Sequence, residues 1–180
     1  MKVEILKSVE RLDEIKKLRV LAYAKSKYSE FINIDSYPNG FSDKLDGRSV
    51  HFVIEKQKTI IAAARLTLVH SLSELPYSNI FSDSGIPNIK PFWFFSKMVV
   101  SPDYKGLGLR SKIDQKRFEF LNSSEYKTFA LMTAKEWRKK ELESKGCLEV
   151  NMVDFSADTY YPFSNKEKTY ILIYNINNDI

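Results

Sequence analysis

A chain of 180 residues with 43% apolar and 28% charged residues can bury a substantial core, which excludes an intrinsically disordered protein. Lysine and arginine exceed aspartate and glutamate by only five, and the surplus is scattered, so no nucleic-acid-binding surface is expected. The single cysteine, Cys147, excludes an intramolecular disulfide and a multi-cysteine metal site.

The N-terminal sequence predicts no secretory signal, because Met1-Lys2-Val3-Glu4 does not lead from a basic region into an apolar stretch. The most apolar segment, residues 60–69, is too short to span a bilayer and contains Arg65. The two histidines, His51 and His70, offer no metal-ligand spacing, and no metal is expected. We therefore expect a cytoplasmic protein without membrane attachment, either a monomer or a homodimer.

The first half of the chain predicts a strand, a helix and a hairpin. Residues 3–6 form the first strand, and Ser8 is a candidate cap for a helix whose apolar residues share one face: Leu12, Ile15, Leu18 and Ala22. Turn signals at residues 38–40 and 46–47 leave room for a short second helix between them. Residues 51–55 and 60–69 alternate as strands joined by a hairpin turn. In the second strand, even-numbered residues from Ile60 to Leu68 point one way and odd-numbered residues the other.

The second half continues the mixed pattern after a long connection at residues 70–92, a length typical of functional loops. Its predicted elements are a strand (93–100), a helix after a glycine turn, a strand (127–133), a helix (134–145) ended by Gly146 and two strands (148–155 and 169–176). No repeat or linker interrupts the chain, so a single domain spanning residues 1–180 is expected. The order predicts an α+β fold with a mixed, largely antiparallel central sheet of about seven strands flanked by about four helices.

The stretch "MVVSPDYKGLGLRSKI", residues 98–113, is the strongest functional signal. The first amides of a helix lack intrahelical partners and carry the positive end of its dipole. Gly106 and Gly108 lack Cβ, so the backbone can approach phosphate oxygens, while Lys105 and Arg110 add positive charge at the rim. A diphosphate fits this arrangement; the alternative is a helix start whose glycines serve turn geometry alone. No Gly-Lys-Ser/Thr follows, which excludes a P-loop.

"VVSPDYKGLGLRSKI" resembles the acyl-CoA-binding motif of the GCN5-related N-acetyltransferases (GNAT): valine, x, proline, x, aromatic, Arg/Gln, x, x, Gly, x, Gly/Ala. Val100, Pro102, Tyr104 and Gly108 match in register. Two positions depart from the motif, because Lys105 replaces Arg/Gln and an arginine, Arg110, stands where Gly or Ala is usual. The predicted strand order is also that of the family. The resemblance therefore implies a GNAT-type fold and an acyltransferase that uses acetyl-CoA or another acyl-CoA.

The resemblance also implies which residues hold the cofactor. The backbone of Met98, Val99 and Val100 would pair with the pantetheine arm and face the thioester. The diphosphate would lie against the amides of the glycine turn: Lys105, Gly106, Leu107, Gly108, Leu109, Arg110 and Ser111. These assignments use main-chain groups, so residues 98–100 can belong to a buried core strand at the same time.

A weaker similarity links "LRVLAY", "FSDKLD", "HFVIE", "AAARLTLV" and "FFSKMVV" to the branch that contains N-acyl amino acid synthases and acyl-homoserine lactone synthases. That branch shows an Arg-Leu pair at a strand end and a Ser-Arg pair before the cofactor strand ends. The corresponding residues here are Arg65-Leu66 and Ser96-Lys97. The acidic residue that precedes the Ser-Arg pair in many members is replaced by Phe94.

The general acid and base of the expected chemistry are not evident. Many GNAT enzymes use a glutamate near the cofactor strand and a tyrosine on the late helix, but these positions are Phe94 and Leu142. The catalytic candidates are Ser96, which could position an amine or a water, and Tyr161, which, like its neighbour Tyr160, could reach the thiolate side. A purely structural role is the alternative for each.

Two further residues have alternative interpretations. Arg65 lies in mid-strand, where an unpaired charge is costly, so it binds a substrate carboxylate or pairs with an internal acid such as Asp43 or Asp46. His51 begins a strand and could act as a base, or it is a capping or surface residue.

The leading functional hypothesis is an N-acyltransferase, an acetyltransferase in the first instance, that acts on a small-molecule or peptide amine. The missing glutamate and tyrosine favour the alternative of a non-catalytic acyl-CoA-binding or sensor module. A third hypothesis is a long-chain N-acyltransferase supplied by acyl carrier protein, with a wide apolar tunnel lined by Trp93, Phe95 and Met132.

Overall fold

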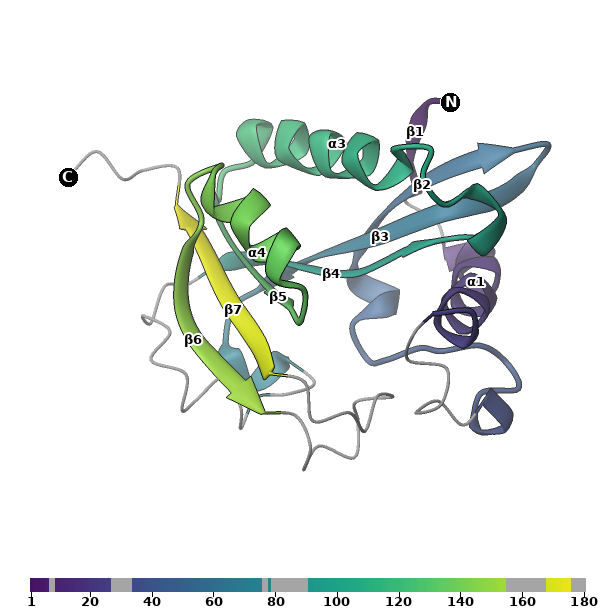
Figure 1. Cartoon of the computed structure of the whole chain (residues 1–180), viewed down its shortest axis with the longest axis horizontal. Coiled ribbons are helices and arrows are strands. Elements are labelled where there is room, and N and C mark those ends of the chain that lie inside the picture. The colour runs from purple at the N-terminus through teal and green to yellow at the C-terminus, as the bar shows by residue number, and fades with distance from the viewer. Residues whose placement is uncertain (7–8, 27–33, 76–77, 79–90, 155–167, 176–180) are drawn as a thin grey trace. The chain divides into compact units, whose positions relative to one another are not determined.

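The computed structural model describes residues 1–6, 9–26, 34–75, 78, 91–154 and 168–175. Seven strands form a single sheet in the order β1-β2-β3-β4-β5-β7-β6 (Figure 1). The strands are β1 (Val3–Leu6), β2 (Val50–Lys56), β3 (Thr59–Val69), β4 (Phe92–Val100), β5 (Thr128–Thr133), β6 (Leu148–Asp154) and β7 (Lys168–Asn175). The α-helices are α1 (Leu12–Ala24), α3 (Leu109–Ser123) and α4 (Glu136–Glu143).

The predicted α+β fold with a mixed, largely antiparallel sheet of seven strands is confirmed. β4 pairs with β5 in parallel, whereas β1 with β2, β2 with β3, β5 with β7 and β7 with β6 pair antiparallel. The number of helices is corrected, because the described residues contain three α-helices rather than about four.

The short helix expected between residues 40 and 46 is absent, and only a single 3-10 turn, η4 (Asp46–Arg48), follows. The cause is local hydrogen bonding by two aspartates. Asp43 Oδ1 accepts a bond from the Leu45 amide (3.0 Å), and Asp46 Oδ2 accepts one from the Asp43 amide (3.1 Å). Such side-chain bonds offer the backbone an alternative to helical pairing.

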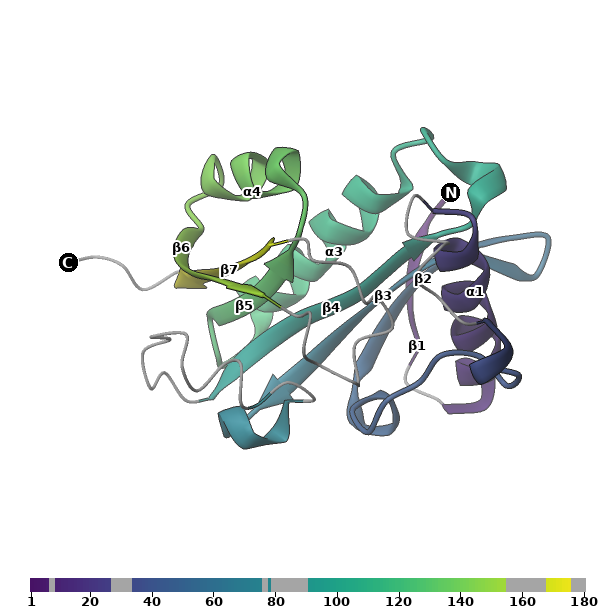
Figure 2. The ribbon, with the colours of Figure 1, turned by 60° about the horizontal axis from the view of Figure 1, so that its bottom comes forward.

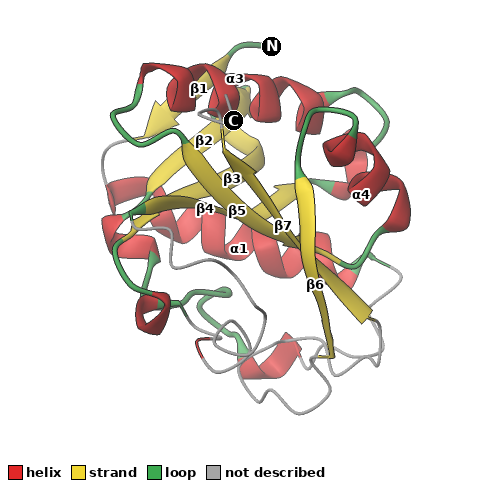
Figure 3. Ribbon diagram, turned by 90° about the vertical axis from the view of Figure 1, so that its left-hand side faces the viewer, coloured by secondary structure: helices red, strands yellow, loops and turns green. Residues whose placement is uncertain are grey.

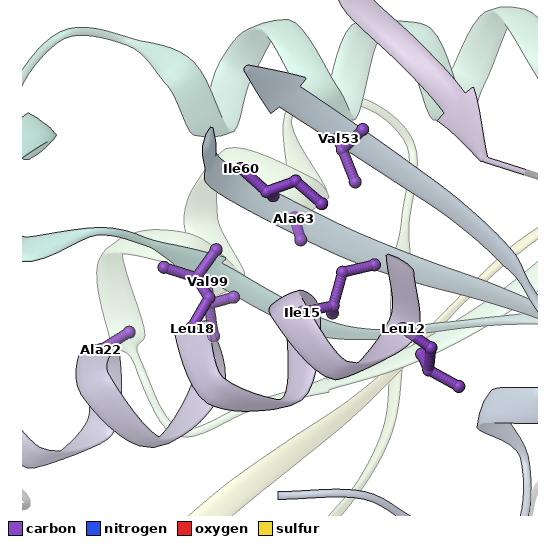
Figure 4. Close-up of a cluster of buried hydrophobic side chains, with 8 residues drawn as sticks. All are labelled: Leu12, Ile15, Leu18, Ala22, Val53, Ile60, Ala63 and Val99. Carbon is purple, nitrogen blue, oxygen red and sulfur yellow. The ribbon is translucent and has the colours of Figure 1, made fainter. Parts of the chain in front are cut away.

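The chain forms two compact units, of which the first comprises Met1–Thr67 and Ser96–Ser123. In this unit α1 and α3 lie on opposite sides of β1, β2 and β3 (Figures 1 and 3). Leu12, Ile15, Leu18 and Ala22 all face the core, as the helical spacing predicts. Figure 4 shows that they form one cluster with four strand residues, Val53, Ile60, Ala63 and Val99. On the opposite side, the ring of Phe52 meets that of Phe120 edge-on at 5.8 Å.

One part of the predicted alternation is wrong. Ile60 was expected on the face opposite Ala63, but both lie in the cluster beneath α1. The register explains this, because Ile54 pairs with Ala62 while the next residue, Glu55, pairs with Ile60. The extra residue on β3 is a bulge, and a bulge shifts every side chain before it to the other face.

The second unit comprises Leu68–Phe95 and Ser124–Ile180. Within it β7 lies between β5 and β6, and α4 lies beside β5 and β7 (Figure 2). Phe129 stacks between Phe95 and Tyr174, with ring centroids at 4.4 and 5.1 Å. No helix in the described part of the chain combines the length and the apolar character that a membrane span requires.

Candidate functional site

The glycine turn connects β4 to α3 through the 3-10 turn η6 (Pro102–Tyr104). Gly106 and Gly108 have φ angles of 81° and 69°, in the left-handed region that residues with a Cβ seldom adopt. A Cβ added at either glycine would meet no other atom within 4 Å. The two positions therefore need glycine for backbone conformation, and the space in front of them is open.

The amides of this turn are available to a ligand. Among the described residues, the backbone N–H groups of Gly106, Leu107, Gly108, Leu109 and Ser111 have no hydrogen-bond acceptor, whereas the amide of Lys112 donates to Gly108 O at 3.2 Å. Residues 105–108 and Ser111 are also exposed. Unpartnered amides at the start of a fifteen-residue helix form an environment that attracts anions.

The two basic side chains at the rim already have protein contacts. Lys105 Nζ donates to the carbonyl of Lys25, directly after α1, at 3.1 Å. Arg110 Nη1 donates to Asp114 Oδ2 at 3.0 Å, and the same carboxylate pairs with the buried Arg117. Asp114 thus offsets the charge of Arg110. The ammonium group of Lys105, by contrast, contacts only the neutral carbonyl of Lys25 among the described residues.

The β4 residues predicted to hold the pantetheine arm differ in burial. Val99 is buried in the cluster beneath α1, while Met98 and Val100 are half-buried. The register of β4 with β5 covers residues 93–95 and 129–131, so residues 98–100 lie outside these pairs. Their assignment to the cofactor stays a prediction.

A second feature of this unit is a network of buried charges, which we call the charge cluster: Arg19, Asp43, Asp46, Arg65 and Lys97. Arg19 binds Asp46 with both terminal nitrogens, at 2.7 and 2.8 Å. Arg65 binds Asp46 at 2.9 Å and Asp43 through Nη1 and, at 3.0 Å, Nη2. Its Nε donates to Ser96 Oγ at 3.0 Å. All three nitrogens of the Arg65 guanidinium therefore have acceptors within the protein, whereas Arg19 Nε has none among the described residues.

Local sequence explains how the cluster assembles. Arg19 lies four residues after Ile15 and therefore projects from the buried face of α1. Asp46 sits at the start of η4, where Ser42 Oγ and the Asp43 amide donate to it, both at 3.1 Å. These bonds hold the Asp46 carboxylate, and the ion pairs then connect the segment before β2 to α1 and β3.

Lys97 is the most unusual member of the charge cluster. Its φ angle is 54°, which interrupts the alternation of β4, so the consecutive side chains of Ser96 and Lys97 both reach the cluster. Lys97 Nζ lies 3.5 Å from Asp43 Oδ2 and 4.2 Å from the centre of the Phe41 ring. The side chain is only 10% exposed.

Burial and neighbouring charges shift the ionisation of these groups. Burial lowers the pKa of Lys97 from 10.5 to about 7; Asp43 opposes the shift and Arg65 adds to it. For Asp43 and Asp46, burial acts to raise the pKa, but the hydrogen bonds and charges of the arginines outweigh it and hold both pKa values below the ordinary carboxyl value. The aspartates are therefore ionised at neutral pH, whereas Lys97 is divided between its two forms.

His51 is buried rather than at the surface. Its Nε2–H donates to the carbonyl of Asp46 at 2.9 Å, while Nδ1 has no hydrogen-bond partner among the described residues. Burial lowers the pKa of His51, so the ring is neutral and positions η4. The described residues contain no group of three or more His, Cys, Asp or Glu side chains that could hold a metal ion.

Of the residues predicted to act on the substrate, Ser96 and Arg65 are joined by a hydrogen bond. Two roles were considered for Arg65, and the structure shows it paired internally with Asp43 and Asp46. Tyr161 and Tyr160 lie outside the described residues. Phe94 and Leu142, at the positions of the usual glutamate and tyrosine, are 2% and 0% exposed.

Sequence reasoning assigned no role to Arg19 and noted Lys97 only as half of a Ser-Lys pair. Each carried a signal. Arg19 shares the helical face of Ile15 and Ala22, and Lys97 interrupts the apolar run FWFFSKMVV of β4. A charge at a position whose neighbours in the pattern are buried indicates a paired or functional group.

No protein-family model matches the sequence, and no curated protein matches it. Solved structures do. A CoA-dependent acyl-homoserine lactone synthase, solved with SAM and isopentyl-CoA, has a TM-score of 0.70 and 13% identity and covers 98% of this chain and 84% of its own. Arylalkylamine N-acetyltransferase 2 from Aedes aegypti has a TM-score of 0.66 and 13% identity over 98% and 100% of the two chains.

The ribosomal-protein-S18-alanine N-acetyltransferase from Escherichia coli has a TM-score of 0.60 and 16% identity, and the match covers 97% of this chain and 93% of that enzyme. At such low identities the similarity establishes a shared fold. The chain has the fold of the GNAT-type N-acetyltransferases and acyl-homoserine lactone synthases.

Proposed function

We propose that the protein is an N-acyltransferase that moves an acyl group, in the first instance acetyl, from coenzyme A to an amine. The acceptor is a small molecule or a peptide. The reaction needs a site for the diphosphate of coenzyme A, a polarised thioester carbonyl and a neutral amine placed against it.

The observation that carries the proposal is the glycine turn. Gly106 and Gly108 adopt left-handed conformations, and five amides of the turn have no acceptor among the described residues. They lie in the turn after β4 and in the first residues of α3, the position at which the family resemblance places the acyl-CoA motif. A diphosphate would accept hydrogen bonds from these amides and gain from the helix dipole. The turn would then fix the cofactor with its thioester along residues 98–100.

A non-catalytic acyl-CoA-binding module is the second candidate, and a specific observation favours it. The side chains of Phe94 and Leu142 are apolar and buried, so neither usual position supplies an acid or a base. The hypothesis of a long-chain enzyme supplied by acyl carrier protein is less well supported. Two of its expected tunnel residues have packing roles, because Phe95 stacks on Phe129 and the indole N–H of Trp93 donates to Ser124 Oγ at 2.9 Å.

Thermal-shift measurements with acetyl-CoA, a long-chain acyl-CoA and free coenzyme A test the proposal, followed by a thiol-release assay over a panel of amines. Stabilisation by thioesters with amine-dependent thiol release is expected. Stabilisation without turnover over the whole panel would indicate the binding module. Turnover only with carrier-bound acyl groups would indicate the long-chain enzyme.

The turn itself is tested with Gly108→Trp, since the indole would fill the open space in front of the amides. We expect the affinity for coenzyme A to fall at least about 100-fold, or roughly 2.7 kcal/mol. The left-handed φ should cost only about 1 kcal/mol of stability. Gly47→Trp is the matched control, because a Cβ there also meets nothing within 4 Å but lies away from the turn. Equal affinities in titration calorimetry of the Gly108 variant and the parent would refute the assignment.

A further inference from the structure

The charge cluster is not balanced. Two carboxylates, Asp43 and Asp46, face two guanidinium groups, Arg19 and Arg65, and the four groups pair with one another at 3.0 Å or less. A protonated Lys97 would be a fifth charge without a counterpart. Its ammonium group would lie 3.5 Å from a carboxylate that Arg65 already binds through two nitrogens. The pairing of the cluster therefore favours the neutral amine of Lys97.

The burial of Lys97 also favours the neutral amine. The side chain is only 10% exposed. Nζ forms no hydrogen bond to any described residue, so the ammonium form is favoured only by the 3.5 Å ion pair with Asp43, which Arg65 already binds, and by the contact with the Phe41 ring. Burying a charge without full hydrogen bonding is costly, and a lysine in such a place gives up its proton readily.

The backbone conformation at Lys97 directs its side chain into the charge cluster. The left-handed conformation at Lys97 turns its side chain toward the same cluster as that of Ser96. A non-glycine residue at positive φ inside a strand is strained, and strained residues concentrate at functional sites. Lys97 also precedes Met98 directly, and residues 98–100 are those expected to lie along the thioester. A base for the acceptor amine is needed at this position, and Phe94 cannot serve as one.

We propose that Lys97 is the general base of the acyl transfer, accepting a proton from the ammonium group of the acceptor. This inference rests on the proposed N-acyltransferase function. It also supplies the base that the two usual positions lack. Ser96 and Asp43, which flank the lysine, act as positioning residues, and Arg65 holds both of them.

Two protons leave the acceptor nitrogen, one to Lys97 and one to the thiolate. The lone pair of the Lys97 amine takes one proton from the acceptor ammonium, which leaves a neutral acceptor amine and a charged Lys97. The amine nitrogen bonds to the thioester carbon, and the resulting tetrahedral species expels the thiolate by breaking the C–S bond. The thiolate takes the second proton from the acceptor nitrogen, giving the amide and free coenzyme A. Lys97 then releases its proton to water.

The other ionisable groups around Lys97 keep one state near neutral pH. Asp43 and Asp46, from the segment before β2, have lowered pKa values and stay ionised. Burial acts to lower the pKa of Arg65 on β3, but the hydrogen bonds and charges of both aspartates outweigh it and raise that pKa, so Arg65 stays charged, and Arg19 on α1 is bound to Asp46. Two further groups stay neutral: burial raises the pKa of Tyr23 on α1 to about 12 and lowers that of His51 on β2. Burial brings the pKa of Lys97 to about 7, so Lys97 alone among these groups changes charge in the working range.

Three variants test the proposal in the thiol-release assay between pH 5.5 and 9.5. Lys97→Met keeps the apolar stem without the amine, and Lys97→Arg keeps a charge that cannot be given up. Lys44→Met removes an exposed lysine next to Asp43 and is the control. For the parent we expect kcat/KM to rise with pH and level off above about 7. In both Lys97 variants we expect kcat/KM to be lower by about 100-fold or more and to rise with pH without reaching a plateau. Their acetyl-CoA affinity and the activity of the control should be unchanged.

The outcomes separate this inference from the function on which it rests. If the parent releases no thiol with any acceptor, the acyltransferase itself is refuted. If the parent is active and Lys97→Met matches it in rate and pH profile, Lys97 is not the base. A parent rate that falls as pH rises through 7 would also overturn the proposal, because it would show that the ammonium form is needed, as for binding an acceptor carboxylate. Reductive ¹³C-methylation gives a readout independent of turnover. An NMR signal absent from Lys97→Met should titrate near 7, and a midpoint near 10.5 would contradict the inference.

Discussion

The glycine turn and the charge cluster lie in the same compact unit but are built in opposite ways. The turn is exposed, uses main-chain amides and depends on two glycines for its conformation. The charge cluster is buried and consists of side chains that come from α1, the segment before β2, β3 and β4. The turn is thus suited to a ligand that arrives with its own charge, such as a diphosphate. The cluster sets the ionisation state of a group that belongs to the protein.

The difference also decides what a substitution does in each place. At the turn a side chain can be added into open space at little cost to the fold, and only the ligand is affected. In the cluster each aspartate and each arginine is held by a partner of opposite charge, so removing one of these four leaves its partners buried and unpaired. Stability should therefore respond to the cluster, and ligand affinity to the turn.

The largest effect on stability is expected for Asp46→Ala. Asp46 accepts from both Arg19 and Arg65, and its loss leaves two buried guanidinium groups with one carboxylate between them. Breaking a buried ion pair costs about 3–5 kcal/mol. Urea unfolding should show a loss of that size.

Asp13→Ala is the matched control. Asp13 also pairs with a basic residue at 3.0 Å, but its side chain is 77% exposed, and surface pairs contribute about 0–1 kcal/mol. If the two variants lost the same small amount, the charge cluster would not stabilise the fold.

These two regions were not equally predictable from the sequence. The turn could be predicted because its signal is local: a strand, two glycines two residues apart and a helix follow one another within sixteen residues. The seven strands could be predicted for the same reason, since alternation is a local pattern. For the cluster only the pairing of Arg65 with Asp43 or Asp46 was foreseen, as one of two alternatives. The rest was not predictable, because the ion pairs join residues 19 to 54 positions apart and nothing local brings Arg19 and Lys97 to the same aspartates.

The two wrong predictions about the fold have physical causes of the same kind. The segment before β2 was expected to hold a short helix, but Asp43 and Asp46 bind its backbone instead. The face of Ile60 was misassigned because a bulge on β3 shifts the alternation. In each case the outcome depends on competition between a local pattern and contacts formed only in the folded chain.

A smaller effect on stability, which depends on pH, is expected for Lys97→Met. In the unfolded chain lysine keeps an ordinary pKa of 10.5, whereas burial lowers that of Lys97 in the folded chain to about 7. Between these values the unfolded state binds more protons, so the stability of the parent rises with pH. Below pH 7 both states are protonated and the full cost of the buried charge is present.

The variant lacks this cost, so its gain over the parent should be largest below pH 7 and should vanish as pH approaches 10.5. At about 1.4 kcal/mol per pH unit, the shift of the Lys97 pKa corresponds to a gain in the free energy of unfolding of roughly 2–4 kcal/mol once the site has relaxed. Chemical denaturation of parent and variant at pH 6, 8 and 10 measures this gain. The control Lys44→Met, at an exposed position, should follow the parent at all three values. A gain that is constant with pH would show that Lys97 titrates normally.

The smallest effect is expected for Lys105→Ala at the rim of the turn. The side chain is exposed, and its single hydrogen bond among the described residues joins Nζ to the carbonyl of Lys25, so the stability should change by about 0.5 kcal/mol or less. An exposed ammonium beside a diphosphate adds about 1 kcal/mol, so the affinity for coenzyme A should fall about threefold to tenfold. Because the amides provide most of the site, this loss is far smaller than that of Gly108→Trp.

Titration calorimetry at low and high salt distinguishes the contribution of the lysine from that of the amides, since added salt should screen the lysine and remove the difference in affinity between parent and variant. A loss as large as that of the tryptophan variant would mean that side-chain charge, rather than the backbone, holds the phosphates.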